Sequence, residues 1–344
     1  MNIESPVEKK ESDQNPFVYN MPVRESYFSN REYIIERILK ETITGSSQGN
    51  AWITGERRVG KTSLLDYIFY KYRNYSKKIK LFPGNEYVSA AFVFLNTQDI
   101  RTREDFYKNM RQCIKTYSDF KIEPLEDPFS NFKNAVKYLL VEQKTYIIFL
   151  LDEFDALVES MAEKDRYSAD SFITELNKLL EGTIGIKFSC VFAANHTLNE
   201  LIEKTGIHGW GSPLIVESIE LPWFTKKQVK ELAKQYLENN SIQFTTKETD
   251  SCFKMSQGYP YFVQKLFSLM YDYKQKEPDP KSYLVKVKEE YGKTFKETID
   301  GWGSVGIPPR TREKLKNLVG YLAKDADRTL SVIFKGIEVL LKNL

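Results

Sequence analysis

The sequence of 344 residues predicts an α/β fold, in which a three-layer core with a parallel sheet is followed by a smaller helical part. Three observations lead to this prediction. A glycine-rich loop near residue 55 stands between a short apolar run and an apolar helical pattern. From there to Pro222, apolar runs of strand length alternate with segments of helical periodicity, as in βαβ units. Beyond Pro222 the apolar period changes from two to about 3.6, which indicates helices.

The glycine-rich loop has the strand, loop and helix order of a phosphate-binding P-loop. Gly55 and Gly60 are separated by four residues and are followed directly by Lys61 and Thr62. Glycine allows backbone angles that turn successive N–H groups toward a polyphosphate, and the helix presents its positive N-terminal end to the same anion. We expect Lys61 to reach the terminal phosphates and Thr62 to ligate Mg²⁺. The residues expected to contact the nucleotide here are Gly55, Glu56, Arg57, Arg58, Val59, Gly60, Lys61, Thr62 and Ser63.

An acidic motif closes a later apolar run, residues 146–151. Carboxylates at the carboxyl end of a parallel strand face the ligand crevice of a doubly wound sheet. Asp152 suits a Mg²⁺ site, and Glu153 is placed to orient or deprotonate a water that attacks the γ-phosphate. Because strands often end in acids, this interpretation depends on the P-loop that precedes it.

The strand expected over residues 186–195 ends in Asn195. Its amide is a candidate catalytic group, which would lie between the two nucleotide motifs and sense the γ-phosphate or hold the attacking water. The alternative is that Asn195 only begins the turn toward Thr197.

The other elements follow from the same periodicities. In the core we expect further strands over 87–96 and 214–221, and helices over 103–117, 128–141 and 169–180. After the core we expect helices over 226–238, 248–255, 262–270, 282–298, 310–323 and 329–341. These elements divide the chain into a flexible tail (1–15), a P-loop core (16–222), a helical part (223–277) and a C-terminal helical region (278–344).

Composition favours a cytoplasmic protein. The N-terminus is polar and acidic rather than a signal peptide, and no apolar run approaches the roughly 20 residues that span a bilayer, so no membrane partner is expected. The three cysteines stand singly, without metal-ligand spacing, and are expected to be reduced, buried thiols. The net charge of +3 by itself does not indicate nucleic acid.

With these motifs assembled, the chain resembles the archaeal-type ATPases, within the STAND-like branch of AAA+ P-loop NTPases. The resemblance covers roughly residues 15 to 275. It rests on the entry segment at Asn15-Pro16-Phe17, on Phe28-Ser29-Asn30-Arg31-Glu32 (with Asn30 where glycine is usual), on both nucleotide motifs, and on Gly258-Tyr259-Pro260-Tyr261.

The resemblance implies ATP or ADP with Mg²⁺, a five-stranded core and a helical lid, usually followed by a winged helix. Phe17 and Val18 would line the approach to the adenine pocket, although plain packing of an N-terminal arm is an equal alternative. Arg31 and Pro260 would also contact the nucleotide, Pro260 from the start of a lid helix.

One departure concerns the arginine with which ring-forming relatives reach a neighbour's γ-phosphate. The corresponding stretch, residues 206–213, has no arginine. We therefore expect a slow ATPase that acts as a STAND-type switch, in which nucleotide state controls oligomerisation or recruitment of an effector protein, as in prokaryotic defence or signalling. The alternative is a DNA-binding AAA+ ATPase, a loader or transposition-type regulator. It is motivated by about 15 Lys and Arg against about 10 Asp and Glu in residues 273–344, which equally suits a solvated helical face.

Overall fold

The computed structural model describes residues 14–23, 27–44, 49–73, 87, 89–117, 125–210, 216–277, 279–303 and 309–324. Most of the expected tail, the stretch 211–215 and the last expected helix (329–341) lie outside these residues. The chain forms two compact units. The first comprises Arg24–Leu221, and the second joins Met1–Val23 to Pro222–Leu344.

A parallel sheet forms the centre of the first unit, in the spatial order β2-β3-β4-β1-β5. Its strands are β1 (Asn50–Thr54), β2 (Ser89–Asn96), β3 (Thr145–Asp152), β4 (Ser189–Ala194) and β5 (Val216–Glu220). All eight residues of β3 are buried, as expected for a central strand covered on both faces. Asn96 pairs with Asp152, and Thr54 pairs with both Ala194 and Glu220, so the strands end together at one edge of the sheet.

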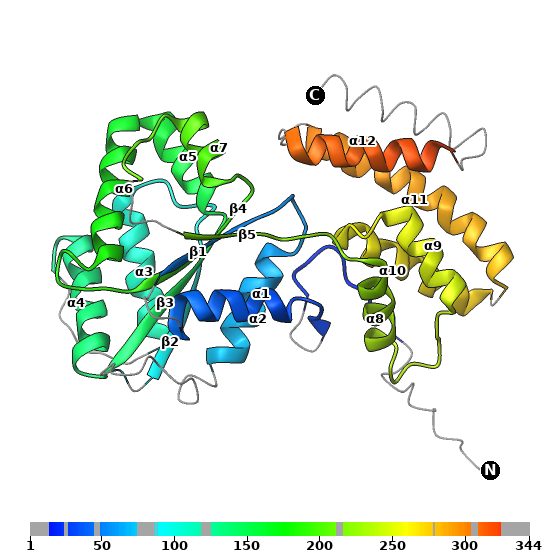
Figure 1. Ribbon diagram of the computed structural model, residues 1–344, viewed down its shortest axis with the longest axis horizontal. Coiled ribbons are helices and arrows are strands. Elements are labelled where there is room, and N and C mark those ends of the chain that lie inside the picture. The colour runs from blue at the N-terminus through cyan, green and yellow to red at the C-terminus, as the bar shows by residue number, and fades with distance from the viewer. Residues whose placement is uncertain are drawn as a thin grey trace, which may run out of the picture. The chain divides into compact units, whose positions relative to one another are not determined.

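Helices cover both faces of this sheet and complete the three layers. Helix α2 (Lys61–Arg73) connects β1 to β2, the strand at one edge of the sheet, and the later connections lead back across the sheet from β2 to β5. Because parallel crossovers are right-handed, α2 lies on one face and the helices of the later connections lie on the other. Figure 1 shows α1 and α2 on one side, and α3, α4 and α6 on the other. The helices are α1 (Glu32–Leu39), α2 (Lys61–Arg73), α3 (Arg103–Tyr117), α4 (Pro128–Val141), α5 (Phe154–Lys164), α6 (Arg166–Glu181) and α7 (Leu198–Thr205).

Two of these helices, α5 and α7, were not among the expected elements. Helix α5 begins immediately after the acidic motif, because Glu153 has a left-handed backbone (φ 54°) that turns the chain without a loop. Helix α7 follows β4 closely and is started by a capping box between Thr197 and Glu200. The expected strand over 186–195 is shorter in the structure, since β4 begins at Ser189.

The second unit contains five described helices: α8 (Lys226–Tyr236), α9 (Thr246–Ser256), α10 (Pro260–Lys276), α11 (Pro280–Gly303) and α12 (Pro309–Lys324). Capping boxes headed by Thr225 and Thr245 start α8 and α9, and a proline occupies the first turn of α10. None of the unit's described residues forms a strand, so the sheet of a winged helix is not seen among them.

The N-terminal segment packs on α10, so residues 16–23, which were expected in the P-loop core, belong to the second unit. Asn15 donates through Nδ2 to the carbonyl and hydroxyl of Ser268 at 3.0 Å and to Asp272 at 2.8 Å. Phe17 is 4% exposed. These contacts lie within the second unit, so the segment is part of that unit's core.

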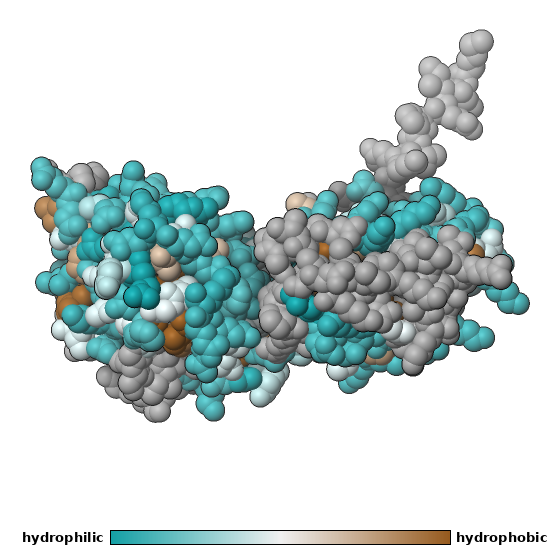
Figure 2. All heavy atoms as spheres, turned by 90° about the horizontal axis from the view of Figure 1, so that it is seen from above, coloured by the Kyte–Doolittle hydropathy of each residue, from teal (hydrophilic) through white to brown (hydrophobic). Residues whose placement is uncertain are grey.

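The face shown in Figure 2 is mainly hydrophilic over the described residues. The exposed large apolar side chains include Tyr33, Val141 and Tyr167. Among the described helices, none combines the length and apolar character required to cross a membrane. The three cysteines are present as thiols; Cys190 and Cys252 are buried, whereas Cys113 is only half-buried.

Candidate functional site

The loop between β1 and α2 has the backbone that a phosphate cradle requires. Gly60 has φ 104°, which a residue with a Cβ rarely adopts, and Arg58 is also left-handed at φ 61°. At Gly55 a Cβ would lie 2.7 Å from the Val59 side chain, so a larger residue would displace the loop. Arg57 and Arg58 are exposed, whereas Glu56, Val59 and Ser63 are buried. The two arginine side chains of the loop are therefore the ones open to solvent, while its apolar and acidic side chains are buried.

Lys61, at the start of α2, folds back over this loop. Its ammonium donates to the carbonyls of Gly55 at 2.9 Å and Glu56 at 3.2 Å, and to Oδ1 of Asn195 at 2.9 Å. Burial lowers the pKa of Lys61, although the nearby carboxylates act in the opposite direction. An anionic ligand in the loop would give this buried cation a stronger partner than two carbonyls.

Thr62 and Asp152 make the closest link between the two sequence motifs. The Thr62 hydroxyl donates to Oδ2 of Asp152 at 2.8 Å. Asp152 is 1% exposed, and its Oδ1 has no hydrogen-bond partner among the described residues. Burial raises the pKa of Asp152 to about 6, with a further contribution from the charge of Glu153 and an opposing one from Thr62.

This pair fits a magnesium ion. A buried carboxylate oxygen without a partner costs free energy unless a cation or a donor approaches it. A hydroxyl and a carboxylate oxygen are the hard ligands that Mg²⁺ takes beside phosphate oxygens. Thr97 fixes the backbone here, donating from N at 2.9 Å and Oγ1 at 2.8 Å to the carbonyl of Asp152.

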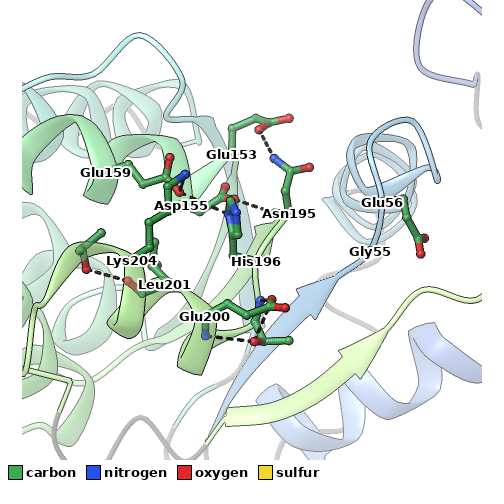
Figure 3. Close-up of polar contacts among 12 residues, drawn as sticks. Gly55, Glu56, Glu153, Asp155, Glu159, Asn195, His196, Glu200, Leu201 and Lys204 are labelled. Atoms are coloured by element: carbon green, nitrogen blue, oxygen red, sulfur yellow. Dashed lines mark hydrogen bonds and ion pairs between the residues drawn. The ribbon is translucent and has the colours of Figure 1, made fainter. Parts of the chain in front are cut away.

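Glu153 occupies a strained position beside this pair. Its backbone is left-handed, with φ 54° and ψ 38°, which costs free energy for a residue other than glycine. The side chain accepts a hydrogen bond from Nδ2 of Asn195 at 3.2 Å. Figure 3 shows the two side chains pointing toward one another from β3 and β4. Strain of this kind is typical of a functional position.

Asn195 bridges the cation and the carboxylate. Its Oδ1 accepts from Lys61 and its Nδ2 donates to Glu153. The turn after β4 is instead organised by Thr197, whose capping box starts α7. The structure therefore brings together Lys61, Thr62, Asp152, Glu153 and Asn195, with the Asn195 side chain between the two motifs. The role of Asn195 with nucleotide stays a prediction.

With this geometry established, comparison with solved structures is informative about the fold. A structure described as a Walker-type ATPase of Pyrococcus abyssi has a TM-score of 0.56 and 15% identity, covering 95% of this chain and 93% of that one. The Orc2 protein of Aeropyrum pernix, in ADPNP–ADP complexes, has a TM-score of 0.54 and 14% identity, covering 96% of this chain and 90% of that one. The Orc1 protein of the same organism, in complex with DNA, has a TM-score of 0.52 and 13% identity, covering 91% of this chain and 84% of that one. The chain shares with these structures a three-layer α/β P-loop fold that is followed by helices.

Sequence comparison adds nothing to this assignment. No protein-family model matches the chain, and no curated protein sequence matches it. At identities of 13 to 15% the likeness establishes the fold alone.

Four further residues, Arg31, Phe17, Val18 and Pro260, were expected to contact the nucleotide. Arg31 is buried in the first unit, where burial lowers the pKa of its guanidinium to about 10. Asn30, before it, has φ 63°, which explains why asparagine can replace the usual glycine. Phe17, Val18 and Pro260 belong to the second unit; the Phe17 ring stacks on Tyr236 with centroids 5.1 Å apart, so its faces are used in packing. Their role at the nucleotide stays a prediction.

Two residues without a role expected from the sequence, Asp155 and His196, lie directly behind Asn195. Oδ2 of Asp155 accepts from the Asn195 backbone at 2.8 Å and from Nδ1 of His196 at 3.0 Å. The sequence signals were present: a third acid in the motif after β3, and a histidine next to the polar end of β4. Neither signal indicates by itself that the two residues meet.

Proposed function

We propose that this chain is a cytoplasmic ATPase that binds Mg·ATP and hydrolyses it slowly, as a STAND-type switch. The observation that carries the proposal is the Thr62–Asp152 pair, with its unpartnered carboxylate oxygen, beside the Lys61 ammonium at a P-loop. Solved structures with this fold include the Aeropyrum pernix Orc2 protein with ADPNP and ADP, which supports an adenine nucleotide as the ligand. In the ATP state the chain would oligomerise or recruit an effector protein.

The residues have distinct tasks in the proposed hydrolysis. Thr62 and Asp152 would hold Mg²⁺, which neutralises charge on the β- and γ-phosphates. Lys61 exchanges its carbonyl partners for phosphate oxygens, and Asn195 keeps Glu153 in place. Glu153 takes a proton from water as the water oxygen bonds to the γ-phosphorus. The bond from that phosphorus to the bridging oxygen breaks, and ADP keeps the electron pair.

Nucleotide affinity tests the binding step. We expect the wild-type chain to bind Mg·ATP in a calorimetric titration and Lys61→Ala to lose at least about tenfold in affinity, because a charge-assisted phosphate contact disappears. Lys71→Ala is the matched control, since Lys71 lies on the same helix and pairs with Tyr67. Absence of Mg·ATP binding by the wild type, or equal binding by Lys61→Ala, would contradict the proposal.

Phosphate release tests the chemical step. Glu153→Gln keeps the shape of the side chain but removes the base, so we expect ATP binding to persist while turnover falls by about 10² or more. Glu163→Gln, at an exposed position on α5, should behave as wild type. Turnover by Glu153→Gln at the wild-type rate would exclude Glu153 as the base.

Light scattering tests the switch. The absence of arginine from residues 206–213 supports low turnover and a long-lived ATP state. We expect the mass of the Glu153→Gln chain, or of its complex with a partner, to rise with Mg·ATP and not with Mg·ADP. If the mass is the same in all nucleotide states, with partner present or absent, the proposed switch is contradicted, although ATP hydrolysis could still occur.

A DNA-binding ATPase is the second candidate, favoured by the basic composition after residue 273 and by the DNA complex of the Aeropyrum pernix Orc1 protein. The exposed lysines 288, 293 and 296 of α11 are the described positions to test. Replacing them with glutamine should weaken DNA binding and reduce its salt dependence. The control replaces lysines 108, 115 and 137, which are exposed in the first unit and carry the same charge. No DNA binding at low salt would remove this candidate.

A further inference from the structure

Four charged side chains form a cluster behind Asn195. Asp155 and Glu159 come from α5, His196 follows β4, and Lys204 lies on α7. Nδ1 of His196 is 3.0 Å from Oδ2 of Asp155 and 3.3 Å from Oε1 of Glu159, and the Lys204 ammonium is 2.8 Å from that same Glu159 oxygen. Figure 3 shows these side chains converging from their three elements.

The charges of the cluster balance when His196 carries a proton on each ring nitrogen: two carboxylates face an imidazolium and an ammonium. The pKa of His196 is raised, chiefly by its hydrogen bond to Asp155 and also by the charge of Glu159. Burial and the charge of Lys204 act in the opposite direction. Burial acts to raise the pKa of Asp155, but the hydrogen bonds from His196 and the Asn195 backbone outweigh it and the pKa is lowered. When it is protonated, His196 is a cation in hydrogen-bond contact with a carboxylate that is only 2% exposed.

Asp155, Glu159 and His196 also have the donors of a transition-metal site, with ligand atoms all within 4.8 Å of one another. A metal ion there would have to displace the proton from Nδ1 of His196 and repel Lys204, which already neutralises Glu159. The proton is the better match to this charge pattern.

The backbone of residues 195 and 196 is held on two sides, by the cluster on one side and by Trp52 on the other. Asp155 accepts the Asn195 N–H at 2.8 Å through the same oxygen that holds the His196 ring. On the other side, the indole N–H of Trp52, in β1, donates to the His196 carbonyl at 3.0 Å. The Asn195 side chain, which extends from this segment, contacts Lys61 and Glu153.

We propose that Asp155 and His196 are positioning residues, which clamp the chain after β4 so that Asn195 holds Glu153 in its place for hydrolysis. The inference rests on the proposed ATPase function. Neither residue contacts the reacting atoms. Misplacement of a catalytic group by about 1 Å can reduce a rate by up to about 10²-fold. Loosening this clamp should therefore reduce turnover much more than nucleotide binding.

The kinetic test compares His196→Ala with His196→Asn. The alanine variant removes the ring, and we expect kcat for ATP to fall about tenfold while Mg·ATP affinity stays within about twofold. Asparagine can place an amide N–H close to the position of Nδ1 but carries no charge, so it should restore only part of kcat. His208→Ala, at the exposed second histidine, should match wild type. Should the alanine variant fold poorly, the asparagine variant still tests the clamp through its pH profile.

The pH profile separates a charge clamp from simple packing. Deprotonation of His196 leaves Asp155 and Glu159 with Lys204 as their only cation in the cluster, so kcat of the wild type should decline as pH rises through the raised pKa of His196. The asparagine variant should lack this decline. Nitrogen-15 spectra of a chain with only two histidines would identify the titration directly, without any assay of ATP.

Three results would overturn the inference. The first is that His196→Ala has the same kcat as the wild type, and the second is that His196→Asn and the wild type have the same pH profile. The third is that the nitrogen-15 signal of His196 shifts stoichiometrically with Zn²⁺ at neutral pH. If the wild type binds no Mg·ATP, the proposed function itself fails, and the nitrogen-15 titration still shows whether the Asp155–His196 clamp exists.

Discussion

The Thr62 hydroxyl donates a 2.8 Å hydrogen bond to Oδ2 of Asp152 and so joins the first turn of α2 to the last residue of β3. The two residues are far apart in the sequence, and their meeting depends on the pairing of parallel strands at the centre of the sheet. Because Oδ1 of Asp152 has no partner among the described residues, the bond satisfies only half of a buried carboxylate. This half-satisfied group has consequences for stability that can be measured without any ligand.

Asp152→Asn should stabilise the chain in the absence of metal. The folded-state pKa of about 6 lies above the ordinary value of 3.8, so the stability linked to the protonated carboxyl is complete below about pH 4 and is lost as pH rises through about 6. Asparagine removes that loss, and we expect about 2 kcal/mol greater stability than wild type at pH 7.5 but little difference at pH 4. Urea unfolding with a chelator present measures this. Asp99→Asn, at an exposed site, is the control, and an unstabilised Asp152→Asn at pH 7.5 would contradict the argument.

Asn195→Ala should lower turnover while leaving the fold intact. The variant keeps the backbone N–H that Asp155 accepts but removes the amide between Lys61 and Glu153. We expect kcat to fall by about 10² and ATP affinity to change by less than about fivefold, since the lost contact orients the base. Steady-state phosphate release measures this, with Asn199→Ala, an exposed residue of α7, as the control. A loss confined to affinity would assign Asn195 to binding instead.

Phe17 is expected to stabilise the second unit. Its ring lies 5.1 Å from Tyr236 and Phe267 and 5.9 Å from Phe244, measured between centroids. Phe17→Ala should cost about 3 kcal/mol, because a buried aromatic side chain is removed from a packed core. Hydrogen exchange of α10 should report the loss, and Val18→Ala, at a half-buried position, should have a smaller effect. Unchanged protection of α10 in Phe17→Ala would show that the segment is not part of this core.

Gly258→Ala should be strongly destabilising. The residue has φ 80°, and an added Cβ would lie 1.9 Å from the carbonyl oxygen of Phe224, whose own N–H donates to the Gly258 carbonyl. Strain and displacement together should cost about 3 kcal/mol or more. Gly320→Ala is the matched control, because that helical glycine has open space around its Cβ position and should gain up to about 1 kcal/mol. Thermal unfolding measures both, and equal stability of the two variants would be inconsistent with this close contact.

Local patterns were sufficient for the sheet core and the phosphate loop. Buried parallel strands are continuous apolar runs, and the structure has β3 at Thr145–Asp152 where the run 146–151 predicted it. The loop depends on glycines at fixed spacing, so its shape also follows from neighbouring residues. Helix α5 was missed because the strand turns into it at Glu153, with no loop to mark a boundary.

What the sequence alone determined is therefore the chemistry of short segments: the P-loop, the acids after β3 and the amide after β4, each placed by hydrophobic period and turn residues. Tertiary structure alone decided which distant segments meet. Asn15 bonds to Ser268, 253 residues away, and His196 meets Asp155 across 41 residues. The physical reason is that periodicity specifies which face of an element is buried, whereas the partner of a polar side chain is set by the packing of whole elements.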